Sequence, residues 1–138
     1  MADAEAPASV LDASAILAVL NDEEGVEVVT EAIANGAAVS IVNWAEILSK
    51  IAERGAEPAT AAAELRRAEG SRRALAIEPL TAADYIEIAR LRPLTKRQGL
   101  SLGDRACLVL AARLDVPALT TDRAWADADV EAEVRIIR

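Results

Sequence analysis

The sequence contains no histidine, no phenylalanine and a single cysteine among its 138 residues. The absence of histidine excludes catalysis by an imidazole base and zinc sites with histidine ligands. One cysteine can form neither an internal disulfide nor a cysteine-based zinc cluster, and this usage is typical of proteins in a reducing compartment. The chain also has no G-x-x-x-x-G-K-[ST] phosphate-binding loop. These absences leave carboxylates as the main candidates for chemistry.

Basic side chains are missing from the first third of the chain. Residues 1–48 contain nine acids and neither lysine nor arginine, whereas residues 49–138 contain 14 acids and all 15 bases. The net charge of −8 therefore arises in the N-terminal third. Many of the bases form two clusters, Arg66, Arg67, Arg72 and Arg73 and then Arg90, Arg92, Lys96 and Arg97. Composition leaves open whether these clusters are solvated helix faces or contact phosphates beside an acidic site.

Long apolar runs are absent as well. No stretch approaches the roughly 18 residues of a membrane-spanning helix. The N-terminus shows no basic segment followed by an apolar run, so no secretory signal is visible. With 53% hydrophobic residues, the chain is expected to be a cytoplasmic globular protein. Residues 1–8 are predicted to be a flexible lead-in, and residues 9–138 to form one domain.

Short apolar segments alternate with helical patterns along the chain. Strands are predicted at residues 9–11, 37–42, 74–77, 117–120 and 134–137. Helical spacing begins at residue 15 and recurs at residues 23–35, 43–54, 58–70, 81–92 and 101–114, with Pro93 ending the fifth helix. This alternation predicts an α/β fold with a mostly parallel sheet covered by helices on both faces.

Four acids stand out by their position relative to these elements. Asp12 follows the first predicted strand, and Asp122 follows the fourth. Glu46 lies in the first turn of the helix after the second strand, and Asp104 opens the apolar helix at residues 101–114. The carboxyl ends of parallel strands share one edge of the sheet, where ligands bind. We therefore expect the four acids to lie along a single rim.

Each acid also has a purely structural interpretation. Acids in the first turn of a helix complement its positive end and cap backbone N–H groups. Ser101-x-x-Asp104 and Asn43-x-x-Glu46 both resemble capping boxes. Taken one at a time, the acids could therefore be helix caps and nothing more.

The acids are more informative as a group. Crowded carboxylates repel one another and hold their protons more tightly unless a cation neutralises them. Hard ions such as Mg²⁺ and Mn²⁺ prefer carboxylate oxygens and keep bound waters. Thr81-x-x-Asp84 has a similar spacing but is predicted to be a cap only, so it serves as an internal control. The group of four predicts a metal site that hydrolyses phosphodiesters.

The four acids lie within four longer motifs, VLDASAIL at residues 10–17, NWAEI at 43–47, LSLGDRACLVLA at 100–111 and LTTDRAW at 119–125. These motifs resemble the signature segments of PIN-domain ribonucleases, and most of all those of the VapC toxins of bacterial toxin–antitoxin pairs. The match follows the family's order and spacing over nearly the whole chain. The resemblance implies a three-layer α/β/α sandwich, an endoribonuclease activity that depends on Mg²⁺ or Mn²⁺, and a cognate antitoxin.

The resemblance also implies roles for individual residues. All four acids form the catalytic site, and Asp12 and Asp104 are the metal ligands. The other two acids complete the site directly or through water. Ser14 and Thr120 occupy positions where the family often places supporting hydroxyls.

Three other classes of protein are considered. A phospho-accepting receiver domain requires a paired acid after the first strand and a lysine after a late strand. Here Asp12 is followed by Ala13, and neither Lys50 nor Lys96 follows a strand. A haloacid-dehalogenase-like phosphatase requires Asp-x-Asp, whereas Ser14 occupies the second position. A non-catalytic interaction protein whose acids are only helix caps remains an alternative.

Two kinds of protein partner are expected. The aliphatic helix at residues 58–70 carries more apolar surface than a small monomer should expose, which predicts a homodimer. A small antitoxin is expected to wrap the helices after residues 14 and 43 and to insert an arginine, or less well a lysine, among the four acids. The unbalanced acids of residues 1–48 would attract such a basic partner.

Overall fold

A computed structural model describes residues 6–68 and 75–138 of the chain. In these residues one sheet has the strand order β3-β2-β1-β4-β5, and every neighbouring pair is parallel. The strands are β1 (Ser9–Leu11), β2 (Ala37–Ser40), β3 (Leu75–Glu78), β4 (Ala118–Thr120) and β5 (Val134–Ile136). The predicted parallel α/β arrangement is confirmed.

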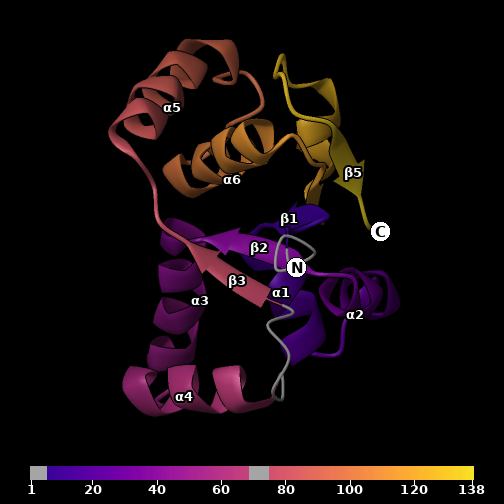
Figure 1. Ribbon diagram of the computed structural model, residues 1–138, viewed down its shortest axis with the longest axis vertical. Helices are drawn as coiled ribbons and strands as arrows, with labels where there is room; N and C mark the ends of the chain where they lie inside the picture. Colours follow the sequence, from indigo (N-terminus) through magenta and orange to yellow (C-terminus); the bar gives the residue numbers. More distant parts are fainter. Residues whose placement is uncertain (1–5, 69–74) are drawn as a thin grey trace.

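Helices cover both faces of the sheet (Figure 1). They are α1 (Ala13–Leu20), α2 (Val26–Ala34), α3 (Ile41–Glu53), α4 (Pro58–Ala68), α5 (Ala82–Leu94), α6 (Leu102–Leu114) and the short 3₁₀ helix η2 (Arg123–Asp127). Helices α1 to α4 lie below the sheet in Figure 1, and α5 and α6 lie above it. The structure is therefore the three-layer sandwich that the sequence motifs implied.

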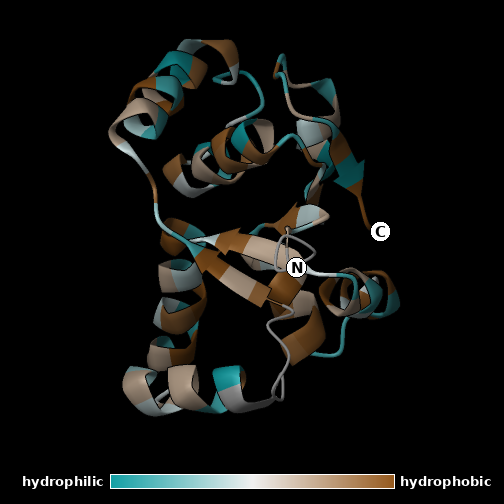
Figure 2. Ribbon diagram, viewed as in Figure 1, coloured by the Kyte–Doolittle hydropathy of each residue, from teal (hydrophilic) through white to brown (hydrophobic). Residues whose placement is uncertain are grey.

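Successive residues of a strand point to opposite faces of the sheet, and each face here has its own core. Val10 packs with Cys107 and Leu108 of α6 on one side. Leu11 packs with Ile16 and Val29 of α1 and α2 on the other. Because both faces are covered, the strands are mostly apolar, and Figure 2 shows much of the sheet in brown and pale brown, with teal at polar positions.

Helix α6 is the most deeply buried helix among the described residues, as its apolar sequence predicted. Its one inward-facing cation, Arg105, is only 8% exposed. The Arg105 guanidinium donates hydrogen bonds to the backbone carbonyls of Ile88 (2.9 Å) and Ser101 (3.3 Å). These bonds connect α5 to the N-terminal turn of α6.

The boundary between the second strand and its helix differs from the prediction. The strand ends at Ser40, and α3 begins at Ile41 instead of residue 43. Ser40 caps α3, because its Oγ accepts a hydrogen bond from the backbone N–H of Asn43 at 3.0 Å. Asn43 is the third residue of the helix, so the predicted capping box Asn43-x-x-Glu46 is wrong. Because Ile41 and Val42 are apolar, they continue the strand pattern in the sequence, and the pattern therefore places the start of α3 too late.

Proline does not end α5. The helix includes Pro93 and stops at Leu94, two residues beyond its predicted end at residue 92. A proline in a helix removes one backbone hydrogen bond and crowds the carbonyl four residues earlier. Because Pro93 lies in the last turn, only Leu94 follows it in the helix. The carbonyl of Leu91 accepts two hydrogen bonds from Thr95, one from its backbone N–H at 2.9 Å and one from its hydroxyl at 2.7 Å.

Some predictions lie outside the described residues. These are most of the lead-in at residues 1–8, the end of helix 58–70 at Gly70, the start of the third strand at Ala74, and the bases Arg72 and Arg73. Within the described parts, no helix combines the length and apolar character that crossing a membrane requires.

Candidate active site

Asp12 is almost fully buried at the end of β1, where it caps α1. Its Oδ1 accepts hydrogen bonds from Ser14 Oγ at 2.7 Å and from the backbone N–H of Ala15 at 2.8 Å. Its Oδ2 accepts a hydrogen bond from Thr120 Oγ1. Each carboxylate oxygen has two acceptor positions. The carboxylate is therefore held from three directions and keeps one acceptor position, on Oδ2, for a further partner.

Burial raises the pKa of Asp12 from 3.8 to about 6. The hydrogen bonds from Thr120, Ser14 and Ala15 lower this pKa, and the nearby charge of Asp104 raises it again. Asp12 therefore holds a proton more tightly than an ordinary aspartate does. A bound cation would take over the role of that proton.

Asp104 is the third residue of α6 and belongs to a complete capping box. Its Oδ2 accepts from the backbone N–H of Ser101 at 2.9 Å, and its own N–H donates to Ser101 Oγ at 3.1 Å. Burial raises the pKa of Asp104, the bonds with Ser101 oppose this, and the charge of Asp122 raises the pKa further. No hydrogen bond from the described residues reaches Oδ1. Asp104 is a cap with one free oxygen.

Glu46 lies one helical turn beyond the start of α3, against the N-terminus of α6. Its Oε1 accepts a hydrogen bond from Asn43 Nδ2 at 2.8 Å, and the same nitrogen donates to the carbonyl of Gly103 at 3.0 Å. The Glu46 carboxylate packs directly on Gly103, where an added Cβ would lie 2.5 Å from Oε1. Glu46 is therefore next to the residue that precedes Asp104.

Asp122 follows β4 and caps η2. Its Oδ1 accepts from the backbone N–H of Ala124 at 3.0 Å. Its own N–H donates to Thr120 Oγ1 at 3.1 Å, so Thr120 connects the backbone of Asp122 to the carboxylate of Asp12. Asp122 is exposed, and no described residue donates a hydrogen bond to its Oδ2.

The four acids gather at the carboxyl edge of β1, β2 and β4. Helices α3 and α6 pack against each other there (Figure 1). The buried thiol of Cys107 lies near the same edge. Burial raises the pKa of this thiol, and the nearby charges of Asp12, Asp104 and Glu46 raise it further. The structure thus brings together the residues that the sequence placed on one rim. Their catalytic roles remain predictions.

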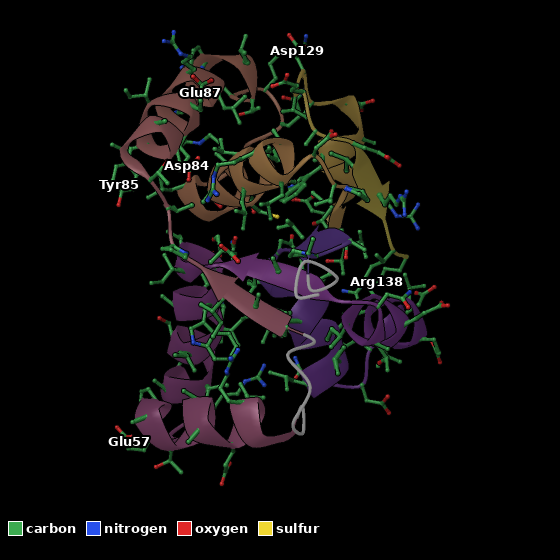
Figure 3. All side chains as sticks on the ribbon, viewed as in Figure 1. Glu57, Asp84, Tyr85, Glu87, Asp129 and Arg138 are labelled. Atoms are coloured by element: carbon green, nitrogen blue, oxygen red, sulfur yellow. The ribbon has the colours of Figure 1, made fainter. Side chains whose placement is uncertain are left out.

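Asp84 behaves differently, although its capping box has the same form. Thr81 and Asp84 cap α5 as predicted. In addition, the guanidinium of Arg113 lies 3.1 Å from the Asp84 carboxylate, an ion pair that the sequence did not reveal. Burial raises the pKa of Asp84, but the bonds from Thr81 and Arg113 prevail and lower it. Figure 3 shows Asp84 between α5 and α6. Asp84 thus caps a helix and pairs with a cation. The pKa values of Asp12 and Asp104, in contrast, are raised by burial and by neighbouring acids.

Sequence reasoning identified Ser14 and Thr120 as supporting hydroxyls, and both donate hydrogen bonds to Asp12. It missed Asn43 and Gly103. A glycine inside a helix costs about 1 kcal/mol relative to alanine, so its presence usually has a packing reason. That signal was available for Gly103. The buried amide of Asn43 carried no comparable signal.

The oxygens of this site fit a hard divalent cation. Within residues 6–68 and 75–138, no three acidic or thiol side chains come close enough to form a complete metal cage. Mg²⁺, however, commonly binds through one or two carboxylates and keeps several waters. Asp12 and Asp104 offer two carboxylates with free acceptor positions and raised pKa values. This donor set suits Mg²⁺ or Mn²⁺.

The profile of the PIN domain family matches residues 9–131, which is most of the chain. The chain belongs to the PIN domain family.

Solved structures with the same fold include a toxin–antitoxin complex from Klebsiella pneumoniae, with 16% identity, 94% of this chain and 98% of that chain covered, and a TM-score of 0.69. VapC20 from Mycobacterium tuberculosis, a sarcin–ricin-loop-cleaving toxin, has 16% identity over 89% of this chain and 96% of its own, with a TM-score of 0.69. VapBC2 from Rickettsia felis, bound to a promoter DNA fragment, has 14% identity over 94% and 98%, again with a TM-score of 0.69. These likenesses concern the fold alone. No curated protein sequence matches the chain.

The raised pKa of Asp12 predicts how the metal-free PIN domain responds to pH. A folded-state pKa of about 6 against 3.8 means that the folded protein binds more protons than the unfolded chain between these values. Stability conferred by the protonated form is lost as the pH rises through this range. Asp12→Asn should therefore stabilise the chelator-treated protein at pH 8, by up to about 3 kcal/mol, and by less at pH 4.

Urea unfolding at both pH values measures this difference. Asp84→Asn is the matched control, because the pKa of Asp84 is lowered and this change should destabilise the protein at pH 8. A chelator-treated D12N protein that is less stable than the wild type at pH 8 would contradict the interpretation of the site.

Proposed function

We propose that this PIN domain is a divalent-metal-dependent endoribonuclease with a catalytic site formed by Asp12, Glu46, Asp104 and Asp122. One observation carries the proposal. Each carboxylate is fixed through hydrogen bonds from nearby groups, yet each keeps an acceptor position that the described residues do not use. Carboxylates that are only caps have no reason to converge in this way.

The four acids would have different roles, which follow their burial. Asp12 and Asp104, with their raised pKa values, would hold Mg²⁺ or Mn²⁺, and Glu46 and Asp122 would complete the site directly or through water. A divalent ion bound there supplies a Lewis acid and lowers the pKa of its bound water. The hydrogen bonds from Thr120 and the α1 turn keep Asp12 in place without rearrangement on binding. The RNA specificity is supported by the sarcin–ricin-loop-cleaving toxin of similar fold.

Cleavage of RNA tests the proposal. Asp12→Asn and Asp104→Asn should each reduce the cleavage rate at least 100-fold, because each removes a carboxylate that binds the ion. Asp129→Asn changes the net charge equally at an exposed position in the segment between η2 and β5 (Figure 3), and it should retain the wild-type rate.

The assay uses total RNA, with mapping of the new 5′ ends. Chelator should abolish cleavage by the wild type, and Mg²⁺ or Mn²⁺ should restore it. Full activity after chelation would refute metal dependence and would favour the alternative of a non-catalytic protein with a contaminating nuclease.

We further propose that the chain is the toxin of a toxin–antitoxin pair. Its acidic surface supports a basic partner, since exposed acids line the region from α1 to α2 at Asp22, Glu23, Glu24, Glu27 and Glu31. Of these, Glu23 forms an ion pair with Arg138 at 3.2 Å. Arginine pairs well with clustered carboxylates, so an antitoxin arginine could occupy the place of the metal.

Expression in the native host tests this role. The chain alone should arrest growth, and a small protein encoded beside it should relieve the arrest. Replacing the inserted arginine of that protein should restore RNA cleavage by the isolated complex. A chain that is harmless alone and binds no small neighbour would refute the toxin role while leaving the nuclease proposal intact.

The proposed homodimer is better supported by α5 than by α4. Ala62 and Leu65 of α4 pack against the core, so helix 58–70 has less free apolar surface than its sequence suggested. The outer face of α5 instead presents Tyr85 and Ile86, which are 61% and 55% exposed. Ala82, Ala89 and Pro93 follow at helical spacing on that face. Figure 3 shows Tyr85 pointing away from the protein.

An acid placed on this face should separate the subunits. Ile86→Glu is expected to yield a monomer, because the charge would be buried in the contact. Val28→Glu, at a 47%-exposed position on α2, is the control and should leave the dimer intact. Light scattering at micromolar concentration measures the mass. A wild-type protein with a monomer mass at all dilutions would disprove the dimer.

A further inference from the structure

The side-chain amide of Asn43 is buried between α3 and α6. It is 1% exposed. Its Nδ2 donates to Glu46 Oε1 at 2.8 Å and to the carbonyl oxygen of Gly103 at 3.0 Å. Its Oδ1 accepts from Ser40 Oγ at 2.7 Å. Both amide hydrogens and the amide oxygen therefore have partners in three separate groups.

These partners determine the orientation of the amide. A reversed amide would turn Oδ1 toward Glu46 Oε1 and the carbonyl of Gly103, which are both acceptors. Only the observed orientation supplies two donors to two acceptors. A buried amide with all its hydrogen bonds satisfied holds its neighbours firmly.

Gly103 provides the surface on which the Glu46 carboxylate rests. A Cβ at this position would lie 2.5, 2.7 and 2.9 Å from Oε1, Cδ and Oε2 of Glu46. Such approaches are too short for van der Waals contact. Gly103 is the second residue of α6 and has an ordinary helical backbone, a place where alanine is normally the better residue. The missing side chain therefore serves the approach of Glu46, and no unusual backbone angle requires it.

We propose that Asn43 is a positioning residue for Glu46, and that Gly103 is the residue that lets Glu46 reach its position beside Asp104. The inference deepens the proposed function, because it concerns how Glu46 contributes to the divalent-cation site. Asn43 draws the Glu46 carboxylate toward α6, and Gly103 leaves room for it there. Either residue acts on the cation only through Glu46.

A simpler interpretation is that Asn43 only joins α3 to α6. The hydrogen bond from Nδ2 to the carbonyl of Gly103 would suffice for that purpose. The two interpretations differ in one respect. A purely structural bond affects unfolding but not the affinity of the folded protein for a cation, whereas a positioning residue affects both.

The first measurement is the affinity for Mn²⁺. Loss of a residue that orients a metal ligand typically lowers metal affinity 10- to 100-fold. Asn43→Ala and Gly103→Ala should each weaken Mn²⁺ binding about tenfold or more. When Glu46 is already replaced by alanine, neither Asn43→Ala nor Gly103→Ala should weaken Mn²⁺ binding further. Asn35→Ala is the control, because Asn35 is an exposed residue at the end of α2, and this change should have no effect.

The second measurement needs no metal. Thermal unfolding in chelator compares Gly103→Ala in the wild type and in the Glu46→Ala protein. Alanine should raise the midpoint in the Glu46→Ala protein, where the space is empty, and should raise it less or lower it in the wild type. Equal changes in both backgrounds would overturn the packing of Glu46 on Gly103.

The outcomes separate the two proposals. Loss of Mn²⁺ affinity from Asn43→Ala that is just as large without Glu46 would overturn the positioning role. A wild-type protein that binds no Mn²⁺ would instead refute the metal site of the proposed function. The unfolding comparison would still decide whether Gly103 accommodates Glu46.

Discussion

Asp12 and Asp104 repel each other across the carboxyl edge of the sheet, and the fold has to hold both carboxylates there. For Asp12 it does so through the order of the strands. β1 pairs with β4 in register Leu11↔Leu119, so the residues after these two positions, Asp12 and Thr120, become neighbours. Thr120 then donates to the Asp12 carboxylate and accepts from the backbone of Asp122. The central position of β1 in the sheet thus creates the link between acids that lie far apart in the sequence.

Helix capping and metal binding are compatible uses of the same side chain. A helix N-terminus offers N–H donors and a partial positive charge, which reduce the cost of placing a carboxylate nearby. Asp12, Asp104 and Asp122 each give one oxygen to this purpose. Asp84 does the same but also pairs with Arg113, which lowers its pKa. The distinction between a cap and a site therefore lies in the surroundings of the carboxylate.

The sequence was sufficient for the parallel α/β fold and for placing the four acids at one edge of the sheet. Apolar strands with an acid at the end, helical spacing and four family motifs all act over short distances along the chain. The features that the sequence did not predict depend mostly on tertiary contacts. The start of α3 at Ile41 was not predicted, because Ile41 and Val42 suit a strand as well as a helix. The contact between Asn43 and Gly103 joins residues 60 positions apart. The ion pair of Asp84 with Arg113 depends on how α5 packs against α6, which no local pattern specifies.

In the proposed site, the open acceptor position on Asp12 Oδ2 and the free Oδ1 of Asp104 belong to one cation. Anomalous diffraction from a crystal grown with Mn²⁺ locates such an ion directly. We expect a peak within coordination distance of Asp12 Oδ2 and Asp104 Oδ1, about 2.2 Å for Mn²⁺ by comparison with the shorter Mg²⁺ and longer Ca²⁺ bonds. The peak should vanish in the Asp12→Asn protein. Wild-type crystals with Mn²⁺ bound elsewhere, or with no peak at this edge under saturating Mn²⁺, would contradict this proposal.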